Sequence, residues 1–139
     1  MTKTGILLTA GLLLGFGLAG GTRAHPVEHF SGIASFYSDD YSGQTANGDQ
    51  YDSTQFTAAH ATLPFGTLLR VSDACNDRSV TVVVTDRGPF VDGRVLDLSK
   101  AAAEALGMLD SGTLLVTAVV ERVRPIRLRA LLSGGTSTP

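Results

Sequence analysis

The chain has 139 residues, 43% of them hydrophobic, with 11 Lys and Arg against 13 Asp and Glu. This length predicts one domain, and the apolar fraction excludes an intrinsically disordered chain. The slight negative charge argues against a nucleic-acid-binding protein, which would present a basic surface to phosphates. Cys75 is the only cysteine, so a disulfide within the chain is impossible and a Cys/His metal cluster is not expected.

Residues 1–24 have the pattern of a secretory signal peptide. Lys3 supplies positive charge, an uncharged apolar run follows over residues 5–20, and the small residue Ala24 precedes a cleavage point. The alternative is a transmembrane anchor, but the run is rich in Gly and shorter than the ~20 residues that a spanning helix needs. We therefore expect an exported protein, periplasmic or secreted, in which residues 25–30 form a linker. No Cys lies near the cleavage point, so we expect no lipid anchor.

The predicted secondary structure is mainly β. Strands are expected where apolar or alternating segments lie between turns rich in Gly, Pro, Asn and Asp. Such segments are 31–37, 55–59, 67–72, 78–85, 94–98 and 113–120. Ser99 is expected to cap one short helix over 100–106, which Gly107 ends.

A closed six-stranded barrel is the arrangement that fits these strands. Segments 80–84 and 113–120 are apolar on both faces, and in so small a chain closure removes exposed strand edges. We expect the barrel domain over residues 31–121. Residues 122–139 are first basic and then rich in Ser, Gly and Thr, which predicts a solvated, disordered tail.

Cys75 lies at the expected tip of the hairpin formed by 67–72 and 78–85. An odd thiol in an oxidising compartment can form an intermolecular disulfide. The favoured interpretation is a partly buried thiol that acts as a small hydrophobic side chain.

Three polar side chains are candidates for chemistry. Asp86 directly follows the most apolar strand, and a carboxyl group at such a junction can be partly desolvated and act as a general acid. His60 ends a strand of small residues, where it could orient that acid. Asp49 lies in the long polar segment 38–54. Structural roles remain open for all three, because Asp and His also stabilise turns through backbone hydrogen bonds. Asp97 could cap the following helix or stand beside Asp86 as a second carboxylate.

Five motifs, in this order, resemble the rare lipoprotein A family. They are GIASFY at 32–37, TANGDQYD at 45–52, TAAHATLP at 57–64, TDRGPF at 85–90 and DLS at 97–99. The resemblance covers nearly the whole predicted domain. It implies a double-psi β-barrel and an endolytic lytic transglycosylase that acts in cell wall organisation. Such an enzyme cleaves the MurNAc–GlcNAc bonds of naked peptidoglycan strands and leaves a 1,6-anhydro product. Related barrels occur in expansins and some endoglucanases.

The resemblance implies catalytic roles for Asp86, His60 and Asp49. The family usually has Glu at the position of Asp49, whose side chain is shorter by one C–C bond, about 1.5 Å. Asp97 matches an Asp that matters in the expansin-like relatives. No metal or organic cofactor is implied.

Four residues are expected to contact the substrate: Tyr37, Asn47, Tyr51 and Asp97. Tyr37 and Tyr51 are candidates for stacking against sugar faces, and packing within the protein is the alternative for both. The expected partner is the peptidoglycan glycan strand, with no nucleic acid and no stable membrane anchor, and the oligomeric state stays open.

Two other functions are compatible with these residues. One is a non-catalytic expansin-like module that binds or loosens the cell wall. The other is a hydrolase that uses Asp86 and Asp97 as a carboxylate pair with a water nucleophile.

Overall fold

The computed structural model describes residues 27–123, and the predicted signal peptide, the first part of the predicted linker and nearly all of the predicted tail lie outside the described residues. Within residues 27–123 there are six strands and one short helix. Their bounds are β1 His29–Phe36, β2 Thr57–Ala59, β3 Leu68–Asp73, β4 Ser79–Asp86, β5 Arg94–Leu98, α1 Lys100–Ala105 and β6 Leu114–Arg122. Each strand lies within two residues of its predicted position, and β1 begins at His29 rather than Ser31.

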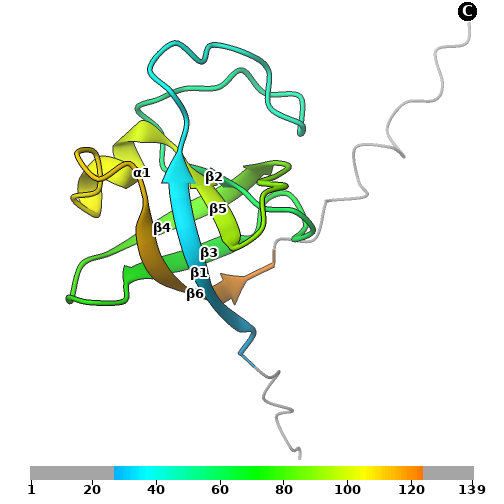
Figure 1. Cartoon of the computed structure of the whole chain (residues 1–139). Coiled ribbons are helices and arrows are strands. Elements are labelled where there is room, and N and C mark those ends of the chain that lie inside the picture. The colour runs from blue at the N-terminus through cyan, green and yellow to red at the C-terminus, as the bar shows by residue number, and fades with distance from the viewer. Residues whose placement is uncertain (1–26, 124–139) are drawn as a thin grey trace, which may run out of the picture.

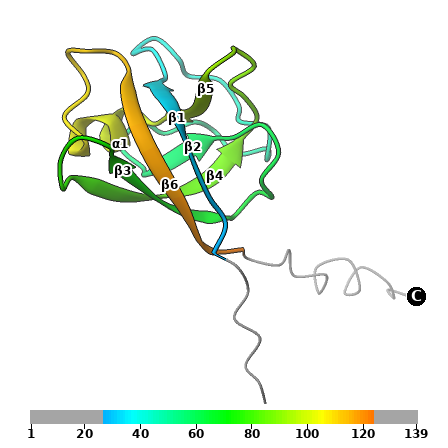
Figure 2. The same cartoon turned by 60° about the horizontal axis from the view of Figure 1, so that its bottom comes forward.

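The strands form a closed barrel in the order β1-β5-β2-β4-β3-β6 (Figures 1 and 2). The pairs β1–β5 and β2–β4 are parallel, and the remaining pairs are antiparallel. Closure leaves no strand of the barrel with an unpaired long edge. The predicted mainly β, six-stranded barrel is therefore confirmed.

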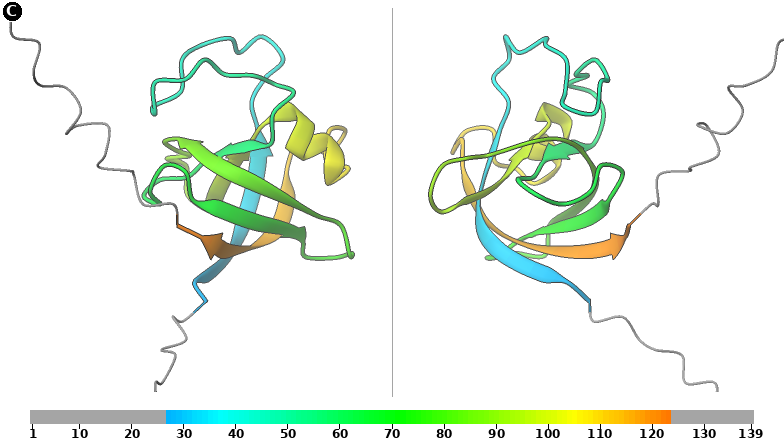
Figure 3. Two further views of the ribbon diagram at one scale, coloured as in Figure 1. Left: turned by 180° about the vertical axis from the view of Figure 1, so that it is seen from behind. Right: turned by 90° about the vertical axis from the view of Figure 1, so that its right-hand side faces the viewer.

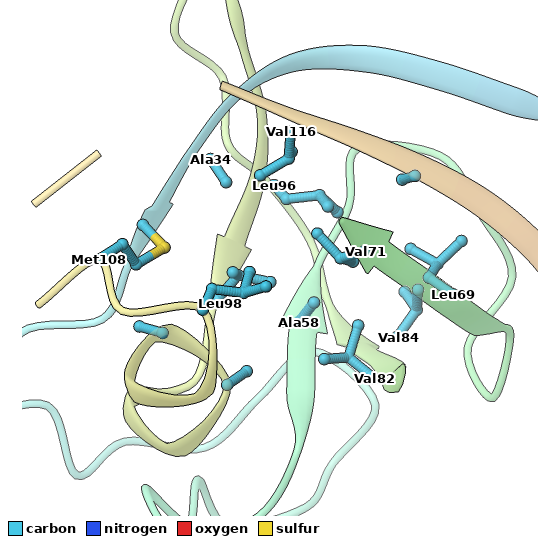
Figure 4. Packing of buried hydrophobic residues seen from close by; sticks show 14 of the residues in the cluster. Ala34, Ala58, Leu69, Val71, Val82, Val84, Leu96, Leu98, Met108 and Val116 are labelled. Carbon is cyan, nitrogen blue, oxygen red and sulfur yellow. The ribbon is translucent and has the colours of Figure 1, made fainter. Parts of the chain in front are cut away.

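The core lies inside the barrel, where alternate residues of each strand point inward (Figure 4). Fully buried side chains include Leu69, Val71, Val82, Val84, Leu96, Leu98 and Val116. Apolar residues on the outer face of β6 are less covered, and Leu115 remains 49% exposed. Although the sequence of β6 is apolar on both faces, only one face is buried and the other is partly exposed.

Helix α1 packs against the barrel through two small side chains, Ala102 and Ala103. Ser99 is its N-cap, as predicted, because its Oγ accepts a hydrogen bond from Ala102 N. The same oxygen also accepts a hydrogen bond from Thr57 N at 3.2 Å, which ties the helix start to the beginning of β2.

The turn between β3 and β4 leaves Cys75 exposed. The interpretation of Cys75 as a partly buried thiol is therefore wrong. The turn is held by the Asp73 carboxylate, which accepts hydrogen bonds from Cys75 N and Asn76 Nδ2, so the thiol is not needed for packing. An intermolecular disulfide through Cys75 stays a prediction.

The segment between β1 and β2 arches over one end of the barrel. The start of β1 and the end of β6 lie toward the opposite end (Figures 1 and 3). A bridge between Gln44 and Gln50 pairs the two limbs of the arching segment.

No helix among residues 27–123 is long and apolar enough to cross a membrane.

Ser99→Ala tests the link between α1 and β2. The change removes the acceptor of two backbone N–H groups at a fully buried position, so we expect unfolding to become easier by about 1–2 kcal/mol. Chemical denaturation measures the loss, with the exposed Ser79→Ala as the matched control. An unchanged midpoint for Ser99→Ala would show that the cap contributes nothing.

Candidate active site

Two carboxylates and a serine lie in one row across the sheet. In the strand pairing, Ser35 is opposite Asp97, Asp97 is opposite Ala59, and Ala59 is opposite Asp86. Asp86 reaches this row because the β2–β4 register shifts after Ala58, which leaves Thr85 as an extra residue in β4. The bulge therefore brings the end of the most apolar strand level with Asp97 of β5, with Ala59 of β2 between them.

The carboxylate of Asp86 is held by hydrogen bonds from three parts of the chain. Its Oδ1 accepts from Ala46 N at 2.8 Å and from Arg87 N at 2.9 Å. Its Oδ2 accepts from the Tyr37 hydroxyl at 2.6 Å. The end of β4, the end of β1 and the long loop therefore meet at this one side chain.

Tyr37 belongs to a cluster of three tyrosines. Its ring centroid lies 5.0 Å from that of Tyr41 and 4.8 Å from that of Tyr51. Burial, and after it the hydrogen bond and negative charge of Asp86, raise the pKa of the Tyr37 hydroxyl far above its ordinary value. Tyr37 therefore stays protonated and keeps donating to Asp86 over the whole physiological pH range.

The turn that contains Asp49 is attached to the end of β4. Asn47 N donates to the carbonyl of Thr85, the residue that the bulge removes from the ladder. Within the turn, Asn47 Nδ2 donates to Asp49 Oδ2 at 2.7 Å, and Asn47 Oδ1 accepts from Asp49 N. Asp49 is exposed, and this turn connects it to Asp86 through Ala46.

His60 is close to Asp86 in the backbone, where His60 N donates to the Asp86 carbonyl. Its ring points elsewhere and packs against Phe30 at 5.0 Å between centroids. Ring Nδ1 accepts the N–H groups of Thr62 and Leu63, so the neutral ring carries its proton on Nε2. Among the described residues, no hydrogen bond joins the His60 ring to the Asp86 carboxylate.

Arg87 follows Asp86 in the chain, but its side chain stabilises the turn at residues 60–65. Its Nη1 donates to the carbonyls of Leu63 at 2.8 Å and His60 at 3.3 Å, and its guanidinium lies 3.9 Å from the centre of the Phe65 ring. These contacts hold the positive charge over a backbone turn rather than against Asp86.

Asp97 is paired with a cation. Its Oδ1 accepts hydrogen bonds from Arg94 Nη2 and from Ser35 Oγ. Residues three apart on a regular strand face opposite sides, but the β1–β5 register shift leaves Val95 as an extra residue and brings Arg94 and Asp97 to one side. Asp97 is therefore not a free second carboxylate.

A pocket of about 470 Å³ opens beside the tyrosine cluster. Its lining residues come from the long loop and are Asp39, Tyr41, Ser42, Gln50, Tyr51, Asp52 and Ser53. Tyr51 is largely buried there, and its hydroxyl accepts a hydrogen bond from Lys100 N.

No group of three or more His, Cys, Asp or Glu within residues 27–123 is placed to hold a metal ion.

Sequence reasoning did not single out the roles of Tyr41, Arg94 and Ser35. Tyr41 stacks on Tyr37 and lines the pocket, whereas Arg94 and Ser35 fix Asp97. The spacing of Ser35 and Tyr37 could have predicted that both side chains point to the site, because residues two apart lie on the same face of a strand. The pairing of Arg94 depends on a bulge that no sequence pattern indicates.

The closed six-stranded barrel, in which β1–β5 and β2–β4 are the parallel pairs, is that of a double-psi β-barrel protein. The family model described as "Lytic transglycolase" matches residues 29–118. The chain belongs to this family.

Curated relatives in several bacteria are similar to this chain. One from Nostoc, named a probable endolytic peptidoglycan transglycosylase RlpA, is 48% identical over 73% of this chain and 26% of its own length. The endolytic peptidoglycan transglycosylase RlpA of Campylobacter jejuni is 43% identical over 80% of this chain and 37% of its own length. The alignments thus span about a quarter to just over a third of these relatives.

Solved structures share the fold. The Streptomyces papain inhibitor superposes with a TM-score of 0.57 and 29% identity over 70% of this chain and 98% of its own. A Clavibacter michiganensis expansin superposes with a TM-score of 0.55 and 23% identity over 71% of this chain and 53% of its own. The expansin likeness concerns the fold alone.

We expect the stability of the protein to depend on pH through His60. Burial first, and then the positive charge of Arg87, lower the pKa of His60, while Glu28 acts in the opposite direction. A lowered folded-state pKa gives stability that is complete above the unfolded value of 6.5 and is lost as the pH falls from there through the folded value. Protonation also removes the Nδ1 acceptor of the 60–63 turn.

His60→Asn keeps a side-chain acceptor for that turn without a titrating ring. Thermal unfolding at about pH 7.5 and about pH 5 should therefore show a larger loss of Tm for the wild type than for His60→Asn. Equal losses in the two proteins would contradict this role of His60.

Proposed function

We propose that this protein is an endolytic peptidoglycan lytic transglycosylase. It would cleave the MurNAc–GlcNAc bonds of glycan strands that lack stem peptides and leave 1,6-anhydro ends. Membership of the lytic transglycolase family and the names of the RlpA relatives support the reaction class. The observation that carries the proposal is the Asp86 carboxylate at the end of the barrel, which is fixed by the Tyr37 hydroxyl and by the backbone N–H groups of Ala46 and Arg87.

The hydrogen bonds of Asp86 determine which oxygen would transfer the proton. A carboxylate offers about two lone pairs on each oxygen. Oδ1 already accepts two backbone N–H groups, whereas Oδ2 accepts only the Tyr37 hydroxyl. Oδ2 therefore keeps a lone pair for a proton, and it is the atom that we assign to acid and base catalysis.

The proposed reaction uses that one carboxyl group twice. Oδ2 protonates the bridging oxygen as the bond from muramyl C1 to that oxygen breaks, and positive charge develops at C1. The muramyl C6 hydroxyl attacks C1, a new C1–O6 bond forms, and the hydroxyl proton returns to Oδ2. No water is consumed, and the enzyme is regenerated in its starting protonation state.

Supporting roles are proposed for Asp49 and His60. Asp49 is exposed on a turn tied to Asp86, where its negative charge would stabilise the positive charge at C1. His60 would offer its Nε2–H to the sugar, because its Nδ1 is committed to the 60–63 turn. Substrate contacts are proposed for Tyr37, which is bonded to Asp86, for Asn47, which is bonded to the neighbouring Thr85, and for Tyr51, which lines the pocket.

The pairing of Asp97 favours a lyase over a hydrolase. A hydrolase of the carboxylate-pair type needs a second carboxylate that is free to activate water. Asp97 forms an ion pair with Arg94 and a hydrogen bond with Ser35 through Oδ1, and that ion pair would be lost if Asp97 took a proton from water. We propose that Asp97 binds the substrate rather than activating water.

The substrate also indicates where the protein works. Peptidoglycan lies outside the cytoplasmic membrane, so an enzyme of this class acts outside the cytoplasm. Export by the predicted signal peptide into the periplasm or the medium, without a lipid anchor, is part of the proposal.

Asp86→Asn tests the catalytic acid. The amide keeps an acceptor oxygen but cannot deliver the proton, so cleavage of naked glycan should fall by roughly 10²–10⁴-fold. Mass spectrometry of the digest measures the rate and identifies the ends, with the exposed Asp110→Asn as the matched control. Anhydro ends from the wild type support the lyase, and reducing ends would indicate the hydrolase. Binding without cleavage by the wild type would indicate the wall-binding module.

Tyr37→Phe tests the orientation of the acid. It removes the one side-chain hydrogen bond to Oδ2, and a bond to a charged group contributes about 1.5–3 kcal/mol. We expect kcat to fall roughly tenfold or more with KM less affected, and the melting temperature to fall by several degrees, because the same bond also ties the end of β1 to the end of β4. Full activity of Tyr37→Phe would show that the hydroxyl does not position Asp86.

A further inference from the structure

An aromatic side chain next to the acid site is almost fully exposed. Phe90 lies in the loop between β4 and β5 and is 82% exposed, and its neighbour Val91 is 56% exposed. A single exposed apolar residue is ordinary, but adjacent ones form a patch of the kind that binding sites use. The loop itself is held, because Arg94 N donates to the Val91 carbonyl at 3.1 Å.

Gly88 places the Phe90 ring beside Asp97. A Cβ atom on Gly88 would lie 3.7 Å from Cε2 of Phe90 and 4.0 Å from Oδ2 of Asp97. The ring edge and the carboxylate oxygen are therefore close to one point, and that point is two residues along the chain from Asp86. The absence of a side chain at Gly88 keeps the space between them open.

Asp97 presents its second oxygen to this space. Arg94 and Ser35 bind Oδ1, whereas Oδ2 accepts no hydrogen bond from any described residue. An apolar ring and a hydrogen-bond acceptor thus face the same small region. A pyranose ring is complementary to both groups, since its apolar C–H face can stack on an aromatic ring and the hydroxyl and amide groups at its edge can donate hydrogen bonds.

We propose that Phe90, Gly88 and Asp97 form a sugar subsite beside Asp86. Phe90 stacks on the C–H face of an N-acetylhexosamine ring next to the bond that is cleaved, and Asp97 Oδ2 accepts a hydrogen bond from a hydroxyl or amide of the same sugar. This inference rests on the proposed function for the identity of the glycan. A membrane surface fits the region less well, because anionic lipid would meet the carboxylates of Asp86 and Asp97.

The test measures binding without turnover. Asp86→Asn serves as the background, and the probe is purified naked glycan strands, with binding followed by co-sedimentation. Adding Phe90→Ala should weaken binding roughly three- to tenfold, and Phe90→Tyr should restore it. Phe56→Ala is the matched control. Phe56 is also exposed, at 48%, but it lies before the first residue of β2, whereas Ala59, which pairs with Asp86 and Asp97, is the last. Phe90 is a surface residue, so its replacement should leave the melting temperature unchanged.

The outcomes separate this subsite from the reaction. Equal binding by all variants, an equal loss for Phe56→Ala, or no detectable binding in the Asp86→Asn background would overturn the subsite. A wild type that does not cleave glycan, together with Phe90-dependent binding, would keep the subsite and remove the lyase. With an active wild type, Phe90→Ala alone should raise KM and leave kcat nearly unchanged, as expected for a residue that binds the ground state and the transition state equally.

Discussion

The hydrogen bonding of Asp86 is the constraint on which the site depends. A carboxylate that accepts several hydrogen bonds is fixed in direction as well as position, because each donor approaches a different lone pair. The donors come from the residue that follows β1, from the start of the β4–β5 loop and from the long loop. Without Asp86, the long loop would lose one of its two ties to β4, and the other is the bond from Asn47 N to Thr85 O.

Two bulges make this arrangement possible in so short a barrel. The extra residue at Thr85 frees a carbonyl for the long loop and brings Asp86 level with Ala59. The extra residue at Val95 turns Arg94 toward Asp97 and presses the Val95 side chain against β1. Gly32 is required there, because a Cβ atom on it would lie 2.5 Å from Cγ1 of Val95.

Local patterns in the sequence were enough for most of the fold. The strands and the Ser99 cap could be predicted because alternation and capping depend on residues close in the chain. The barrel followed from edge avoidance, and the position of Asp86 followed from a strand that ends in a polar motif. His60, Asp49 and Asp97 were also candidates from the residues themselves, and the resemblance supplied the roles, which the fold alone does not decide.

Features that depend on the direction of a side chain or on a bulge could not be predicted from the residue pattern. The direction of the His60 ring is set by Phe30 and by the N–H groups of Thr62 and Leu63. The pairing of Arg94 with Asp97 needs the bulge at Val95, which breaks the two-residue period of a strand. The error at Cys75 had a related cause, because its exposure follows from the Asp73 side chain holding the turn.

The distribution of positive charge suits the proton transfer that we propose for Asp86. Within residues 27–123, Arg94 pairs with Asp97, Lys100 pairs with Asp39, and Arg87 is held by two carbonyls and the Phe65 ring. The side chain of Asp86 therefore meets only uncharged donors. A carboxylate held by a salt bridge would have to break that ion pair whenever it took up a proton. One held by neutral dipoles keeps its orientation in both protonation states, which is what a single acid and base in one reaction requires.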